Sequence, residues 1–110
     1  MSEQHHPLDA IEFIYRESPL YAKAKADRVY LEQFRKSKKA ILMGQCTEKA
    51  AVAREQYAYA HEEYVALLAG LREAVEIEET LRWRLVAAQA KVEIWRTESA
   101  NNRNMDRAAQ

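Results

Sequence analysis

The sequence predicts an all-α protein: a long antiparallel helical hairpin of the coiled-coil type with a short N-terminal helix, completed by oligomerisation. Apolar residues recur at alternating spacings of three and four from Ala50 to Trp95, which is the pattern of a long helix packed along one face. Only two glycines and two prolines occur in 110 residues, so the chain has few places to turn. Acidic and basic residues alternate in blocks although the net charge is zero, as suits antiparallel neighbouring helices.

The first half of the chain predicts two helices that are separated by a proline. A short helix is expected over residues 8–17, directly after Pro7, because proline suits the first helical turn. Ser18 and Pro19 then predict a stop and a restart, with Ser18 as the N-cap and Pro19 at the first helical position. The second helix is therefore expected over residues 19–43.

The turn of the hairpin is expected at Gly44–Thr47, with Gly44 as the C-terminal cap and Thr47 as the next N-cap. A reversal of the chain there predicts a definite register between the long helices. It places Lys36 near Glu55, and Arg28 near Glu62 and Glu63. Basic and acidic blocks then face one another, which agrees with the predicted fold.

The third expected helix covers residues 48–99 and carries the heptad seam, in which Glu78 is the one polar residue. We expect Glu78 to pair with a base such as Arg82 or to specify oligomer register. A break near His61 or Gly70 is the alternative, and it would fold the chain into a compact four-helix monomer. Residues 100–110 lose the periodicity and predict a flexible tail. The seam consists of Ala50, Ala53, Tyr57, Ala60, Tyr64, Leu67, Leu71, Ala74, Glu78, Leu81, Leu85, Ala88, Val92 and Trp95.

Length and composition predict one domain over residues 1–110. Cys46 is the only cysteine, so no intramolecular disulfide can form and nothing points to an oxidising compartment. The chain begins without a basic segment followed by an apolar one, and it has no apolar window of membrane-spanning length. We therefore expect a cytoplasmic protein without a membrane role.

A second apolar stripe on the C-terminal part of the long helix predicts self-association, because a helix that is apolar on two stripes needs two neighbours. This stripe holds Trp83, Val86, Ala87, Ala90 and Ile94. A homo-oligomer, most simply a dimer, is the expected state. The predicted interface residues are Leu81, Trp83, Leu85, Val92 and Trp95.

Basic residues are the strongest functional signal, because bases interleaved with aromatic residues can bind phosphates and stack on nucleobases. A solvated, ion-paired helix surface is the alternative interpretation, and the sequence leaves both open. The candidate residues for nucleic-acid or partner binding are Lys23, Lys25, Arg28, Arg35, Lys36, Lys38 and Lys39 in the second helix, with Arg96 and Arg103 further on.

The sequence offers no constellation for catalysis or for a metal. The pair of His5 and His6 lies in a terminal arm, and His61 has no second histidine at metal-binding spacing. The segment around Gly44 lacks the framework of a nucleotide-binding loop. We therefore expect no enzyme activity, no cofactor, no metal and no small-molecule substrate.

Three stretches resemble small phage and prophage proteins: LYAKAKADRVYLEQFRKSKKAILM, YAYAHEEYVALLAGLREAVEIEETLRW and VEIWRTESANNR. The resemblance covers residues 7 to about 103. Genes of this kind lie among early genes for recombination and single-stranded DNA handling, so the resemblance implies a phage origin and the cytoplasm of a bacterial host. It assigns no active-site residue.

Two functions follow as hypotheses. The first is a non-enzymatic phage accessory protein that oligomerises, assists DNA recombination or replication, and contacts single-stranded DNA or a recombination partner through its basic helix. The second is a protein–protein interaction module without nucleic-acid binding, either a structural adaptor or a phage-encoded inhibitor of a host system. In the second hypothesis the contact surface is the apolar stripe around Trp83 and Trp95.

Overall fold

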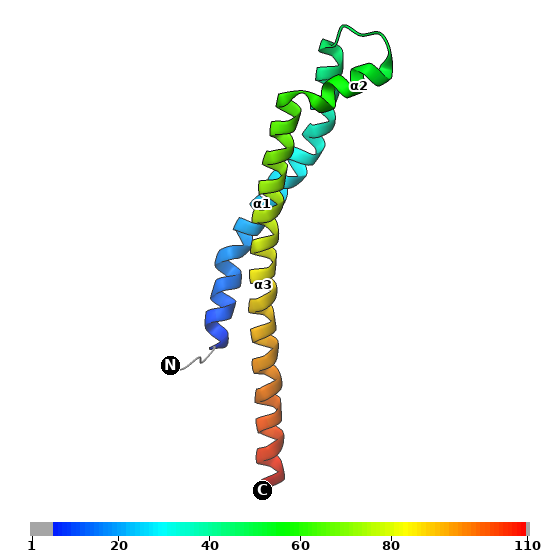
Figure 1. Cartoon of the computed structure of the whole chain (residues 1–110). Coiled ribbons are helices and arrows are strands. Elements are labelled where there is room, and N and C mark those ends of the chain that lie inside the picture. Colours follow the sequence, from blue (N-terminus) through cyan, green and yellow to red (C-terminus); the bar gives the residue numbers. More distant parts are fainter. Residues whose placement is uncertain (1–5, 110) are drawn as a thin grey trace. The chain divides into compact units, whose positions relative to one another are not determined.

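The computed structural model describes residues 6–109 of the chain, and His5 lies outside this range. Three helices follow one another along it: α1 (Pro7–Gln45), α2 (Ala51–Ala60) and α3 (Glu62–Ala109) (Figure 1). No strand occurs within residues 6–109. The predicted all-α class is confirmed.

Packing contacts divide the chain into two compact units, and α1 and α3 each contribute to both. Unit 1 comprises Met1–Tyr21 and Thr80–Gln110, and unit 2 comprises Ala22–Glu79. The single domain predicted for residues 1–110 stays a prediction, because the grouping of contacts does not establish how many parts unfold cooperatively.

The expected boundary at Ser18 and Pro19 is wrong, since α1 runs through both residues without ending. Ser18 is not an N-cap: its hydroxyl donates a hydrogen bond to the carbonyl of Ile14, one turn back. A proline inside a helix removes one backbone hydrogen bond and crowds the carbonyl four residues earlier, at a cost of about 3 kcal/mol. The helix-forming sequence around Pro19 and the remaining bonds of a 39-residue helix outweigh that local cost.

The end of α1 also differs from the expectation. Gly44 is not a left-handed cap, because no glycine in the described chain has a positive φ, and α1 continues to Gln45. Instead, the Arg54 side chain of α2 donates from Nε to the carbonyl of Met43 at 3.1 Å. This contact satisfies one of the carbonyls that every helix leaves without a partner at its C-terminus.

The long helix predicted over residues 48–99 is wrong at both ends. Thr47 caps nothing, since α2 begins at Ala51 after Ala50. At the other end α3 continues to Ala109, so residues 100–109 of the predicted flexible tail are helical. The residues from 97 to 109 include neither glycine nor proline, and without such a residue an existing helix extends at little cost.

His61 interrupts the helix, as one alternative anticipated, whereas α3 passes through Gly70. The backbone of His61 is extended, with φ −66° and ψ 138°. Its ring Nδ1 accepts a hydrogen bond from the backbone N–H of Glu63 at 3.0 Å, so His61 caps the start of α3. The described chain therefore has three helices and not the four of that alternative.

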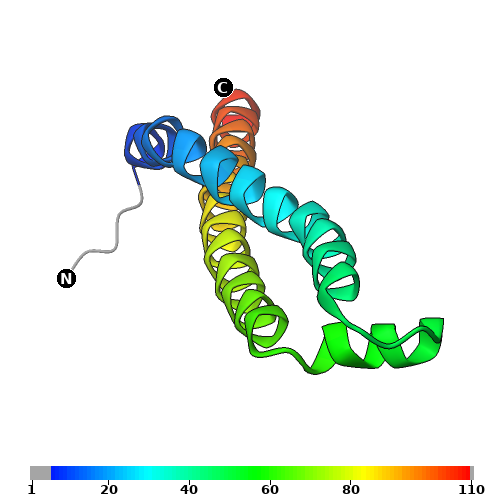
Figure 2. The ribbon, with the colours of Figure 1, turned by 90° about the horizontal axis from the view of Figure 1, so that it is seen from above.

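The core of unit 2 lies where its three helices meet. Leu42 of α1, Ala58 of α2 and Tyr64 of α3 are buried together, and Met43 packs against them. Figure 2 shows α2 crossing from the end of α1 to the start of α3. The break at His61 is what allows α2 to turn across and bring Ala58 onto Leu42.

The heptad seam is confirmed along α3 from Tyr64 to Val92. Tyr64, Glu78 and Ala88 are buried, and the apolar seam positions between them are partly buried. Tyr57 and Ala60 of the predicted seam are exposed, because the break at His61 shifts the phase of the preceding residues. The partly buried positions are Leu67, Leu71, Ala74, Leu81, Leu85 and Val92.

The helices of unit 2 are antiparallel as expected, but the predicted register is wrong. Arg28 pairs with Glu78, about four turns beyond the predicted partners Glu62 and Glu63. Glu55 pairs with Lys39 in place of Lys36. The register differs because residues 46–61 form a loop and a separate crossing helix before the antiparallel run of α3 begins.

No helix in the described part of the chain is long and apolar enough to cross a membrane.

Candidate binding surfaces

The basic stretch of α1 is largely neutralised by acidic residues of the same chain. Four of its seven candidate residues form ion pairs, two of them with α3 and one with α2. The pairs are Lys23 with Asp27, Arg28 with Glu78 and Glu32, Lys38 with Glu63, and Lys39 with Glu55. The geometry therefore shows ion pairing on this surface, and it leaves fewer cations for an external polyanion.

The pair of Arg28 and Glu78 is the best enclosed of these contacts. Arg28 donates from Nε to Oε1 of Glu78 at 2.6 Å and from Nη2 to Oε2 at 3.0 Å, while Nη1 donates to Glu32 at 3.0 Å. Glu78 is 5% exposed. The hydrogen bonds that Arg28 donates to Glu78 lower the pKa of Glu78 and raise the pKa of Arg28, so both groups stay charged at neutral pH.

The prediction that Glu78 pairs with a base is confirmed, and the base is Arg28 of α1. This bidentate contact fixes α1 against α3 within unit 2, because its planar geometry tolerates little displacement. Glu78 thus sets the register inside one chain. A role for Glu78 in oligomer register stays untested.

Three bases of the stretch have no hydrogen bond or ion pair within the described chain: Lys25, Arg35 and Lys36. Arg35 and Lys36 lie together with Lys39 at one hollow of unit 2, whereas Lys25 lies elsewhere. The structure therefore brings together only part of the predicted basic surface.

That hollow, which we call the tyrosine–cation hollow, has a volume of about 380 Å³ and is lined by Arg35, Lys36, Lys39, Tyr59 and Tyr64. The ammonium of Lys39 lies 4.8 Å from the centre of the Tyr59 ring and 3.2 Å from Glu55. The side chain of Tyr59, and then Glu55, raise the pKa of Lys39, which keeps its charge. The ring centres of Tyr59 and Tyr64 are 5.3 Å apart in an edge-to-face contact.

In unit 1, the seam residues of α3 and the second apolar stripe point to opposite sides of the helix. Ala88 is buried on the seam, and Leu81, Leu85 and Val92 are partly buried there. The second stripe, which we call the outer stripe of α3, is exposed: Trp83 and Ile94 are each 58% exposed. The Arg82 guanidinium lies 4.4 Å from the Trp83 ring centre. The outer stripe of α3 consists of Trp83, Val86, Ala90 and Ile94. Ala87, the fifth residue of the predicted second stripe, lies at its edge and lines a hollow together with residues of α1.

The segment of α1 in unit 1 carries an outer stripe as well. Ala10 is buried and lines a hollow of about 380 Å³ that also contains Phe13 and, from α3, Ala87 and Ala88. Leu8, Ile11 and Tyr15 recur at spacings of three and four on the opposite side of the helix. Tyr15 is 85% exposed. Both helices of unit 1 thus present apolar side chains away from their mutual contact.

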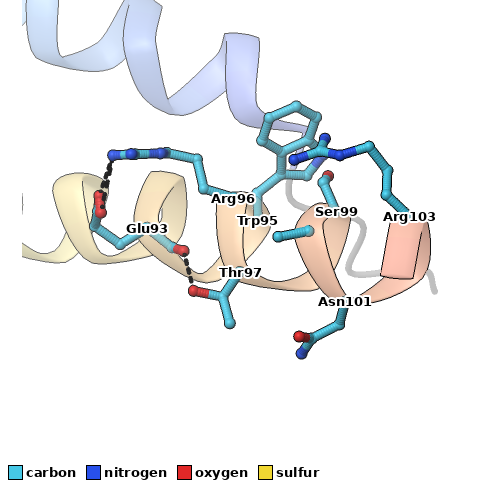
Figure 3. A pocket seen from close by; sticks show the side chains of 8 residues that line it. Glu93, Trp95, Arg96, Thr97, Ser99, Asn101 and Arg103 are labelled. Atoms are coloured by element: carbon cyan, nitrogen blue, oxygen red, sulfur yellow. Dashed lines mark hydrogen bonds and ion pairs between the residues drawn. The ribbon is translucent and has the colours of Figure 1, made fainter. Parts of the chain in front are cut away.

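A third hollow, of about 410 Å³, lies along the C-terminal turns of α3 and contains Trp95, Arg96 and Arg103. Figure 3 shows Trp95, Ser99 and Arg103 on one side of successive turns, with the Arg103 guanidinium beside the Trp95 indole. Arg96 instead pairs with Glu93 at 2.6 Å. Since all eight lining residues belong to one helix, this surface is open and does not enclose a ligand.

The structure adds two residues, Tyr59 and Tyr64, that the sequence did not assign to any candidate site. Tyr59 and Tyr64 join the basic residues only because the chain breaks at His61, and the heptad pattern alone did not distinguish this break from a continuous helix. The alternation of charge blocks did signal that bases of α1 would meet acids of α3. No group of metal-binding residues occurs within the described chain.

Comparisons of the chain with protein-family models, with curated proteins and with solved structures found no match.

Proposed function

We propose that the chain is a non-enzymatic helical module that acts through protein–protein contact, and that its first partner is a second copy of itself. The observation that carries this proposal is the poor apolar core of unit 1. The buried apolar residues of its described part are Ala10 and Ala88, while Leu8, Ile11, Tyr15, Trp83 and Ile94 remain exposed.

Two helices whose fully buried apolar residues are alanines gain little from that burial, because an alanine side chain is a single methyl group. Helices of this length owe most of their stability to the packing of an apolar face. Burying the two outer stripes against another molecule would supply the missing apolar contact. Exposed apolar stripes of this kind commonly mark protein–protein interfaces.

Charge favours a second copy as the partner. In unit 1 the α1 segment over residues 7–21 has three acids and one base, whereas the α3 segment over residues 80–109 has six bases and three acids. Glu12 lies on the same side of α1 as its outer stripe. When the α1 stripe of one copy lies on the α3 stripe of the next, a head-to-tail contact, opposite charges meet at the interface.

Sedimentation equilibrium at micromolar concentration tests this proposal. We expect assemblies of two or more copies for the native chain, and we expect Trp83→Glu and Ile94→Glu to give monomers, since each places a charge within the outer stripe. The matched control is Gln89→Glu, which adds the same charge at an exposed position outside the stripe. A monomeric native chain, or equal weakening by the control, would contradict the proposal.

Nucleic-acid contact is the second candidate function, and the unpaired bases Lys25, Arg35 and Lys36 favour it. The recombination or replication setting, the phage origin and the bacterial cytoplasm stay predictions from the resemblance. Anisotropy of labelled single-stranded and duplex DNA tests the contact at low and near-physiological salt. Binding that weakens steeply with salt is the expected result for a phosphate contact, and absence of binding at low salt would reject this candidate.

A further inference from the structure

We propose that the tyrosine–cation hollow of unit 2 is a binding site for a phosphate group. This inference deepens the second candidate function, because it names the atoms that would contact a phosphate. It does not depend on self-association, which we assign to unit 1.

The charge of the hollow favours an anion. Arg35, Lys36 and Lys39 bring three positive charges to it, and no acidic residue lines it. Glu55, at 3.2 Å from Lys39, offsets one of these charges, and two remain without a partner in the described chain. Unpaired cations that converge on one hollow attract an anion more strongly than cations dispersed over a helix.

The donors suit phosphate in particular. A guanidinium presents two parallel N–H groups that match two phosphate oxygens, while a lysine ammonium acts as a compact point charge. Arg35 can supply the first kind of contact, and its neighbour Lys36 the second. Both side chains retain their full donor capacity, since neither makes a hydrogen bond to another described residue.

The aromatic residues of the hollow are held in place by the core of unit 2. Tyr64 is buried with Leu42 and Ala58, and its ring holds Tyr59 in the edge-to-face contact. Tyr59 is about half exposed, so part of its ring is available to an aromatic group next to the phosphate. A nucleotide or a single-stranded nucleic acid has both parts, and stacking on an aromatic ring is one way in which proteins bind such strands.

Charge-matched variants separate a defined site from general attraction. Arg35→Gln and Lys36→Gln each remove one positive charge from the hollow, and Lys49→Gln removes one from an exposed position in the loop between α1 and α2, outside the hollow. The probe is a labelled ten-residue oligothymidylate, followed by anisotropy at several salt concentrations.

We expect each hollow variant to weaken binding about ten-fold, as for the loss of a charge-assisted contact. The slope of log K against log salt should fall by about 0.7 for each lost phosphate contact on a single strand. Lys49→Gln should change the affinity less than about two-fold. Equal weakening by all three variants would overturn the proposal, as would a failure of the oligothymidylate to bind the native chain.

Competition with inorganic phosphate distinguishes the two sources of the ligand. Displacement of the labelled probe from the native chain, but not from Arg35→Gln, supports a site that accepts a free phosphate. Selective weakening by the hollow variants without displacement supports a site that requires the phosphodiester of a strand. Sedimentation of the same variants reports separately on self-association, which these substitutions in unit 2 should leave unchanged.

Discussion

Truncation of Leu42 tests whether the small cluster at the α1–α2–α3 junction is the core of unit 2. Leu42 is fully buried, at 0% exposure, whereas its neighbour Ile41 is 50% exposed on the same helix. Leu42→Ala removes three buried carbon atoms, which corresponds to about 2 kcal/mol of transfer free energy. The cavity adds to this loss, but flexible Met43 packs beside it and can fill part of the space, so we expect about 2–3 kcal/mol in total.

Ile41→Ala is the matched control, and we expect it to lower the free energy of unfolding by about 1 kcal/mol or less. The assay is urea unfolding followed by far-ultraviolet circular dichroism at one fixed protein concentration, since self-association would make the midpoint depend on concentration. A loss below about 1 kcal/mol for Leu42→Ala, or one no larger than that of Ile41→Ala, would refute the assignment of the core.

The same experiment tests the prediction of a single domain. Both tryptophans, Trp83 and Trp95, belong to unit 1, so their fluorescence reports on that unit while circular dichroism reports on all three helices. In one cooperative domain, Leu42→Ala lowers the urea midpoint by the same amount in both signals. A lower urea midpoint by circular dichroism, with an unchanged midpoint by tryptophan fluorescence, would show that the units unfold separately.

Two further predictions concern α1 and its contact with α3. Pro19→Ala should stabilise the chain and raise its helix content, because it restores the backbone N–H and removes the clash inside α1, with a gain of up to about 3 kcal/mol; a neutral or destabilising effect in urea unfolding would indicate that Pro19 begins a helix. Glu78→Gln should destabilise the chain at neutral pH and flatten its acid sensitivity. The pKa of Glu78 is lowered in the folded state from its ordinary value of 4.5, so its stabilisation is present above that value and is lost as pH falls through the folded pKa. Urea midpoints measured from pH 7 downward check this, and parallel curves for the variant and the native chain would contradict it.

The sequence predicted the helices well where the local residue pattern is compatible with a single structure. The seam from Tyr64 to Val92 is the less exposed side of α3, because apolar periodicity directly determines which side of a helix can be buried. The boundary at Pro19 was mispredicted since proline is compatible with a first turn and, at a cost, with an interior position. Its local preference could not show that the surrounding helix would tolerate that cost.

The candidate sites, too, could be predicted from the sequence only in part. The sequence identified the bases of α1 but not their partners, because a register shift of a few residues changes every pair between antiparallel helices. The crossing of α2 decided that shift. It turned Arg28 toward Glu78 and left Arg35 and Lys36 beside Tyr59 and Tyr64.

The sequence by itself determined the all-helical class, the packed side of α3 and the presence of a second apolar stripe, since these follow from residue periodicity and helix propensity within one segment. The tertiary structure alone decided where the helix breaks, which charges are neutralised and which stay unpaired. These properties depend on distances between residues far apart in the chain. The break at His61 sets those distances, because it determines where α3 begins its antiparallel run along α1.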